Sequence, residues 1–200
     1  MRKSLLILVS IFLLSFSAKL YSTCHDGYLS ASFTIRTPIN NCLYTVYYCY
    51  KCMSPAPQIG IILDYFYKND TACTESMGAD ELIEYFENYL RERFFSWGVC
   101  TNVPPPCDPN DLNAYIVLSM SYSKCWYKEN SSGTIIWHNC LTIYCCVETR
   151  WCWGVNGPTE IAVGIPYICK QGTDCPAGVQ PDPLNSGETT DCFHLWTPCP

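Results

Sequence analysis

Sixteen cysteines constrain this 200-residue chain more than any other feature, and all of them lie after residue 23. This density is typical of small exported domains whose apolar cores cannot hold the fold without cross-links. We therefore predict that every cysteine is oxidised, namely Cys24, Cys42, Cys49, Cys52, Cys73, Cys100, Cys107, Cys125, Cys140, Cys145, Cys146, Cys152, Cys169, Cys175, Cys192 and Cys199. A disulfide-rich fold in an oxidising compartment is the main expectation.

The first 22 residues have the composition of a secretory signal peptide. Arg2 and Lys3 precede an apolar run over residues 5–16, and small polar residues follow where a signal peptidase would cut. We expect residues 1–22 to be removed and the product to be secreted, extracellular or at the cell surface, with the periplasm as an alternative. No later stretch approaches the roughly 18 apolar residues of a membrane span, so we expect none in the mature chain.

Two other roles for the cysteines stay open. Cys49 and Cys52 form a C-x-x-C pair, and Cys145 and Cys146 are adjacent, a spacing that also suits zinc. Cys24 could carry a lipid, although acylation would leave an odd number of cysteines. Export favours disulfides over both roles, so we expect no metal and no cofactor.

The chain repeats part of itself after about a hundred residues. The pattern K-x-x-T-x-C occurs at Lys68 and again at Lys170, and N-C-L begins two similar segments at residues 41–49 and 139–146. Such self-similarity predicts a tandem duplication. The first copy is one residue longer, which predicts a β-bulge at Leu43 and the residue after it.

We place the first unit at residues 23–108 and the second at residues 109–200, the latter with an irregular C-terminal tail. Matching the units leaves seven cysteines in the first and nine in the second, so at least one disulfide must cross between them. We expect this cross-link to involve Cys24. A further bridge between Cys145 and Cys169 is expected within the second unit.

Strand-like alternation of polar and apolar residues dominates both units. Residues 30–36 and 42–51 flank a turn and predict a hairpin, and residues 125–128 and 134–139 predict a second one. Residues 114–123 alternate as well and predict another strand. These segments favour antiparallel sheets with one buried face.

One amphipathic helix is predicted at about residues 79–97, in the first unit. Its apolar residues recur at three- and four-residue steps, at Leu82, Ile83, Phe86, Leu90, Phe94 and Trp97. Glu87 can pair with Arg91 one turn on, and Gly98 is a natural stop. The sequence thus predicts a mainly β (α+β), disulfide-rich fold of two tandem related antiparallel β units, the first carrying this helix.

Catalytic motifs are scarce. The chain has neither G-x-S-x-G nor G-x-x-x-x-G-K-[ST], and its histidines, His25, His138 and His194, lack metal-ligand spacing. Asp64 lies in an apolar run, where an acid is unexpected, and a glycosidase needs two carboxylates with different environments. We predict no catalytic residue and keep a secreted hydrolase acting on glycans as the alternative.

Four tryptophans, Trp126, Trp137, Trp151 and Trp153, gather in the second unit. Trp151 and Trp153 flank Cys152 and so project from one face of a strand. Flat aromatic surfaces suit sugar rings and protein partners, so these four form the candidate ligand-binding platform. The alternative is that they pack the core.

The balance of charge narrows the class of partner. The chain has 12 basic and 18 acidic residues, a formal net charge of −6. An acidic chain has no electrostatic footprint for phosphate backbones, which argues against nucleic acid. We therefore expect an extracellular or cell-surface binding or structural protein whose ligand is an extracellular protein or a glycan.

Overall fold

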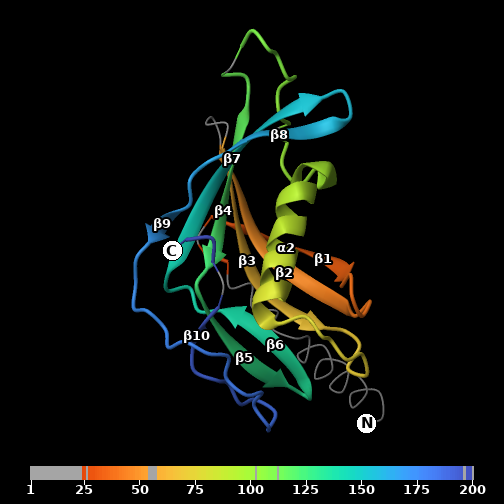
Figure 1. Cartoon of the computed structure of the whole chain (residues 1–200), viewed down its shortest axis with the longest axis vertical. Coiled ribbons are helices and arrows are strands. Elements are labelled where there is room, and N and C mark those ends of the chain that lie inside the picture. The colour runs from red at the N-terminus through yellow and green to blue at the C-terminus, as the bar shows by residue number, and fades with distance from the viewer. Residues whose placement is uncertain are drawn as a thin grey trace, which may run out of the picture.

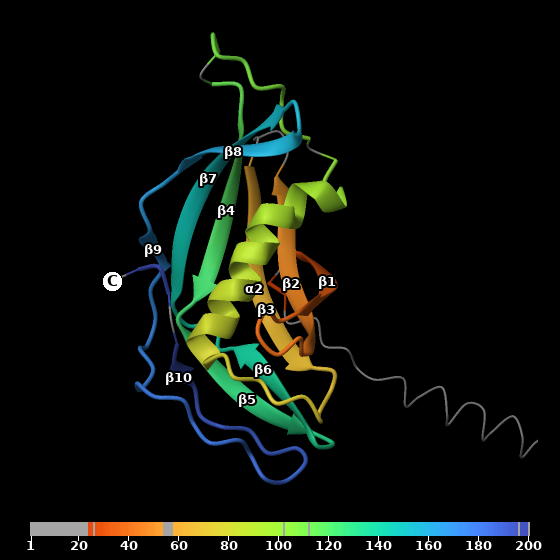
Figure 2. The ribbon, with the colours of Figure 1, turned by 45° about the vertical axis from the view of Figure 1, so that its right-hand side comes forward.

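The computed structural model describes residues 24, 25, 27–53, 58–101, 103–111, 113–195 and 197–199. Within them the chain forms one large mixed β-sheet with a single long helix, α2 (Ala79–Arg93), across one face (Figures 1 and 2). The predicted signal peptide at residues 1–22 lies outside the described residues. In the described part, no helix has the length and apolar character needed to cross a membrane.

The sheet is built from short strands that follow the predicted alternation. They are β1 (Leu29–Arg36), β2 (Leu43–Met53), β3 (Gln58–Lys68), β4 (Ile116–Ser123), β5 (Cys125–Ser131), β6 (Thr134–Asn139), β7 (Tyr144–Gly154), β8 (Gly157–Val163), β9 (Tyr167–Lys170) and β10 (Phe193–His194). A short 3-10 helix, η1 (Phe94–Trp97), continues α2. This mainly β architecture with one helix confirms the predicted fold class.

β1, β2 and β3 form an antiparallel meander at one side of the sheet. Arg36 pairs with Leu43 across the first turn, which confirms the first predicted hairpin. The predicted bulge at Leu43 is wrong, because the register of β2 and β3 shifts between Tyr47 and Tyr48 instead. The extra residue at this shift is Asp64 of β3.

α2 connects β3 to β4, which lie side by side and run parallel. A parallel pair needs a crossover connection, and the helix supplies it. Glu81 in the first turn accepts a hydrogen bond from the N–H of Gly78 at 2.9 Å. Gly98 ends the helical segment in the left-handed conformation, with a φ of 62°. The predicted helix is thus confirmed, with its last four residues forming η1.

β4 continues the sheet by pairing with β7, whose far side pairs with β8 and β9. The hairpin of β5 and β6, which was also predicted, branches from this path because β6 pairs with Tyr65, Phe66 and Tyr67 of β3. β10 pairs with the outer side of β5. The sheet is therefore continuous across the predicted boundary after residue 108, and the tandem duplication stays a prediction.

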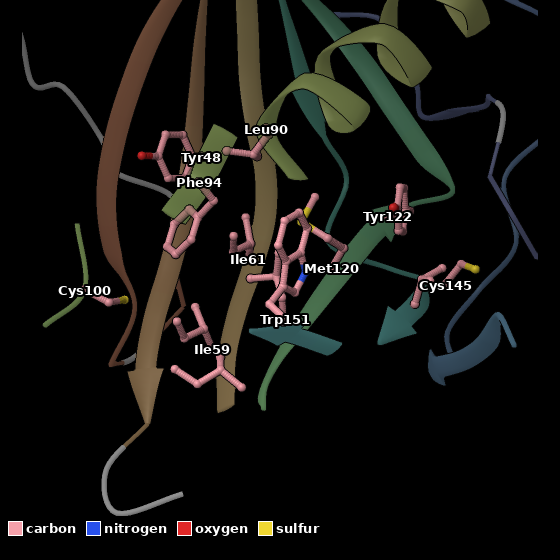
Figure 3. Close-up of a cluster of buried hydrophobic side chains, with 13 residues drawn as sticks. Tyr48, Ile59, Ile61, Leu90, Phe94, Cys100, Met120, Tyr122, Cys145 and Trp151 are labelled. Atoms are coloured by element: carbon pink, nitrogen blue, oxygen red, sulfur yellow. The ribbon is translucent and has the colours of Figure 1, made fainter. Parts of the chain in front are cut away.

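The main core lies between the sheet and α2. A first cluster joins side chains of the helix and the central strands, among them Leu90, Met120 and Trp151 (Figure 3). A second cluster lies nearer the start of α2 and contains Phe86 and Trp126. On the opposite, open face of the sheet, the described residues form a small apolar cluster beside the N-terminal segment.

Eight disulfides pair all sixteen cysteines, as predicted. The pairs are Cys24–Cys49, Cys42–Cys73, Cys52–Cys100, Cys107–Cys152, Cys125–Cys175, Cys140–Cys192, Cys145–Cys199 and Cys146–Cys169. The zinc and lipid alternatives are contradicted, because no thiol is left for a metal or for acylation of Cys24.

The link between the predicted units does not involve the expected cysteine. Cys24 bonds to Cys49 within the first unit, because the N-terminal segment packs against the open face of β2. Cys107, in the loop after η1, bonds to Cys152 of β7 instead. A cross-link between the units was predicted and is present, but the prediction of its cysteines was wrong.

Cys169 bonds to Cys146 and not to Cys145, as had been predicted. Adjacent residues of a strand point to opposite faces. Cys145 packs in the core beneath α2 and bonds to Cys199. Cys146 points to the opposite face of the sheet, where it bonds to Cys169 of the neighbouring strand β9. The alternation of β7 already places Cys145 on the apolar face, a signal that the predicted pairing overlooked.

Candidate functional site

The four tryptophans of the predicted platform do not share one surface. Trp126 is 0% exposed and its indole N–H donates to the carbonyl of Ser123 at 3.0 Å. Trp151 is 4% exposed and donates to Thr149 Oγ1 at 2.7 Å. The core alternative therefore holds for these two residues, whose polar atoms are satisfied internally.

The other two tryptophans line separate cavities at opposite ends of α2. Trp137 borders a cavity of about 550 Å³ beside the first turn of the helix. Its ring is already covered, with Phe66 stacked at 5.7 Å and Lys128 Nζ at 4.6 Å. Trp153, 43% exposed, borders an apolar cleft of about 270 Å³ together with Phe95 of η1. Neither offers an extended aromatic surface.

Asp64, the acid that the sequence singles out, and Glu75, an acid beside the cavity next to α2, lie on opposite faces of the sheet. Asp64 is 2% exposed, and its carboxylate lies within 4.8 Å of the sulfur atoms of Cys24 and Cys49 on the open face. Glu75 borders the large cavity on the helix side, where its Oε1 accepts hydrogen bonds from the N–H groups of the next two residues. A glycosidase needs two carboxyl groups flanking one bond. These two acids cannot form such a pair.

Two groups of potential metal ligands occur among the described residues, and both contain a disulfide. They are Cys24, Cys49 and Asp64, and Cys125, Asp174 and Cys175. In each group the two cysteines are bonded to each other, so neither group provides a thiolate. Neither group includes a histidine.

The open face of the sheet carries a row of rings that sequence reasoning missed. Strand pairing aligns Tyr47 of β2 with Tyr65 of β3, Tyr65 with His138 of β6, and His138 with Tyr127 of β5. Residues paired directly across neighbouring strands point to the same face. We call these four residues, together with Tyr67 beside Tyr47, the tyrosine ladder.

Successive rings of the tyrosine ladder contact one another, by stacking in Tyr47–Tyr65 and Tyr127–His138 and at a tilt of 32° in Tyr65–His138. The ring centroids of Tyr47 and Tyr65 are 4.2 Å apart with an interplanar angle of 12°. Those of Tyr127 and His138 are 4.9 Å apart with an interplanar angle of 14°, and those of Tyr65 and His138 are 5.4 Å apart. Tyr65 is buried, whereas the other rings are partly exposed. Stacked rings turn their edges, rather than their faces, toward a ligand.

The bulge at Asp64 decides which aromatic residues of β3 reach the open face. Ile61 points toward α2, and strict alternation from it would place Tyr65 and Tyr67 under the helix as well. The extra residue reverses the facing, so that Phe66 packs in the core and the two tyrosines lie on the open face. Sequence alternation could not show this, because the position of a bulge depends on the partner strand.

The tyrosine ladder is polar but largely uncharged near neutral pH. Burial lowers the pKa of His138 although the nearby Glu129 raises it, with Glu129 Oε2 3.1 Å from His138 Nε2. Burial also raises the pKa of Tyr47, Tyr65 and Tyr127. The ladder therefore presents neutral hydroxyl and imidazole groups with one acid at its side.

Comparisons with known proteins give no family for this chain. No family model matches it, and no curated protein or solved structure does so either.

Proposed function

We propose that this chain is a secreted, disulfide-stabilised binding protein of the extracellular space or cell surface, and that the tyrosine ladder is its ligand-binding surface. Disulfides at every cysteine support an oxidising compartment. The observation that carries the proposal is the contrast between the two faces of the sheet. α2 buries one face, while every ring of the ladder on the other face except that of Tyr65 stays partly exposed. Such tyrosines combine apolar area with hydrogen-bonding edges, as binding surfaces do.

A protein partner suits the ladder better than a glycan. A sugar ring binds an aromatic side chain across a free face. Tyr65 lies between Tyr47 and His138, and His138 lies between Tyr65 and Tyr127, so the central rings have their faces covered. Edges and hydroxyl groups remain, and these hydrogen-bond to the backbone and polar side chains of another protein.

Alanine substitutions at the two ends of the ladder test this proposal. Tyr47→Ala and Tyr127→Ala should each weaken binding by at least about tenfold, because truncating a tyrosine that anchors an interface costs roughly 2 kcal/mol. The measurement is surface plasmon resonance of the oxidised chain against arrayed extracellular protein domains and arrayed glycans. Tyr115→Ala, which removes a partly exposed tyrosine outside the ladder, is the matched control and should leave binding unchanged.

A thermal melt of each variant separates lost contacts from lost folding. Tyr127→Phe keeps the ring and removes the hydroxyl, so an intermediate loss would assign part of the affinity to the hydroxyl. Binding that survives both alanine variants would contradict the proposed surface. Binding to glycans alone would contradict the proposed class of ligand.

A further inference from the structure

The largest group of exposed apolar side chains lies far from the tyrosine ladder, at the edge of the sheet formed by β8 and β9. More than half of the exposed large hydrophobic residues in the described part of the chain fall within residues 153–168. They are Trp153, Val155, Ile161, Val163, Ile165, Tyr167 and Ile168. Exposed apolar residues gathered in one place indicate an interaction surface.

The backbone at this edge is also open. β8 and β9 pair with β7 on one side, and no described strand pairs with their outer side. An edge strand presents unpaired N–H and C=O groups that can pair with another strand. Proteins usually protect such edges with charged side chains, especially lysine. Residues 151–169 contain one charged residue, Glu160, and it lies 3.6 Å from Nε of Arg91 on α2.

Two prolines limit the length of chain that can pair. Pro158 begins and Pro166 ends a stretch, residues 159–165, in which every backbone N–H is present. Within it Ile161 is 49%, Val163 56% and Ile165 88% exposed. A partner must therefore supply a short, apolar, uncharged strand of matching length.

We propose that this edge joins two copies of the chain, with residues 159–165 of each pairing antiparallel about a two-fold axis. A second copy provides a strand of the required length and character. The chain as a whole is acidic, with a net charge of −6, so two copies repel each other over most of their surface. At this edge two copies can meet without bringing like charges together, because the one acid there, Glu160, already faces Arg91 of its own chain.

The pairing closes on itself. In an antiparallel arrangement about an axis, each copy offers the same patch to the other, so residues 159–165 of both copies are occupied and cannot pair with a third copy. A standard protein interface buries about 800 Å² per partner. The short stretch at residues 159–165 buries less than that, so the dimer should be weak and reversible. Higher salt should strengthen it by screening the repulsion between the two acidic copies.

Sedimentation velocity of the oxidised chain over a roughly hundredfold concentration range tests the proposal, since dimerisation follows mass action. Wild type should shift from monomer to dimer, and Val163→Lys should weaken association by at least about tenfold by placing two like charges across the axis. Leu184→Lys makes the same kind of change at a residue 90% exposed on the C-terminal tail, and should behave as wild type.

Hydrogen exchange locates the contact independently of any variant. Amides of residues 159–165 that face outward should exchange more slowly as the concentration rises. A wild-type chain that stays monomeric throughout would overturn the proposal, even if the edge binds a strand of another protein. A dimer that Val163→Lys leaves intact would overturn it as well, because the contact would then lie elsewhere.

Discussion

Glu87 is the most unusual side chain in the core between α2 and the sheet. It is 1% exposed, and neither of its carboxylate oxygens has a hydrogen-bond partner among the described residues. The predicted pair with Arg91 is not formed, because Arg91 turns toward Glu160. Burial, with a smaller contribution from Glu84, raises the pKa of Glu87 well above 4.5. The folded protein therefore keeps this carboxyl group protonated where an exposed glutamate would ionise.

Glu87→Gln should stabilise the protein at neutral pH. Below a pH of 4.5 the residue is protonated in both states, but above it the unfolded chain ionises while the folded chain does not. The free energy of unfolding of wild type therefore falls as the pH rises toward the raised folded pKa. Glutamine does not ionise and so removes this loss, which makes the variant more stable than wild type by an amount that grows from acidic to neutral pH. Chemical denaturation over a range of pH measures it.

The pH dependence of the difference between variant and wild type is the decisive quantity. Glu92→Gln removes an exposed acid from the same helix and should change stability little at any pH. A stabilisation by Glu87→Gln that does not grow from acidic to neutral pH would contradict the inferred protonation of the buried carboxyl.

At the level of single residues, the sequence located the aromatic side chains but not their facing. Trp126 and Trp151 were predicted to bind a ligand and are core residues. Tyr65 and Tyr67 would share the helix-covered face with Ile61 by strict alternation, but they lie on the open face. Facing depends on register and bulges, which strand partners impose from outside the local segment.

At the level of elements, prediction succeeded where the pattern is local. The two hairpins, β4 and α2 follow from residues that are close in the sequence. The pairing of β3 with both β4 and β6 has no local signature, because it joins segments separated by a helix or by another strand pair. This pairing is what assembles the tyrosine ladder, so the candidate site could not be predicted together with the strands that carry it.

The elements also bear on the predicted duplication. The hairpin of β2 and β3 and that of β7 and β8 have the same register near their turns, with Met53 opposite Gln58 and Trp153 opposite Pro158. The disulfides differ, however. Cys24–Cys49 has no counterpart in the second unit, where the matching cysteines bond elsewhere. A duplication after which the disulfide pairs changed would account for both the shared register and the different cross-links. The duplication itself stays a prediction.

The end of the helical segment permits a clean test of backbone strain. Gly98→Ala should cost about 1 kcal/mol of stability, because its φ of 62° is a left-handed conformation that disfavours a side chain. A Cβ there would meet no atom within 4 Å, so the cost is purely conformational. Gly78→Ala, at the N-cap of α2 with a φ of −64°, introduces no left-handed strain and should cost less, although alanine is a poorer N-cap residue than glycine. Equal costs at both positions, measured by urea denaturation, would contradict this assignment.

At the level of the whole molecule, one disulfide and the pairing of strands both connect the part of the chain before residue 108 to the part after it. Three disulfides lie wholly before residue 108 and four wholly after it, and Cys107–Cys152 alone joins the two parts. The sheet joins them again without covalent bonds, through the pairing of β3 with β4 and β6. The two kinds of connection can be broken separately.

Cleavage at a protease site inserted beside the exposed Asn110 should leave the two parts linked. On a denaturing gel without reductant the cut wild-type chain should migrate as one species, because Cys107–Cys152 spans the cut. In the double variant Cys107→Ser, Cys152→Ser the same cut should give two fragments, which should nevertheless elute together in native gel filtration since the strand pairing across β3 remains. The lost cross-link should lower the stability of the uncut variant by about 2 to 5 kcal/mol. Two fragments from oxidised wild type would disprove this link, and separate elution of the cut variant would show that the disulfide, not the sheet, holds the parts together.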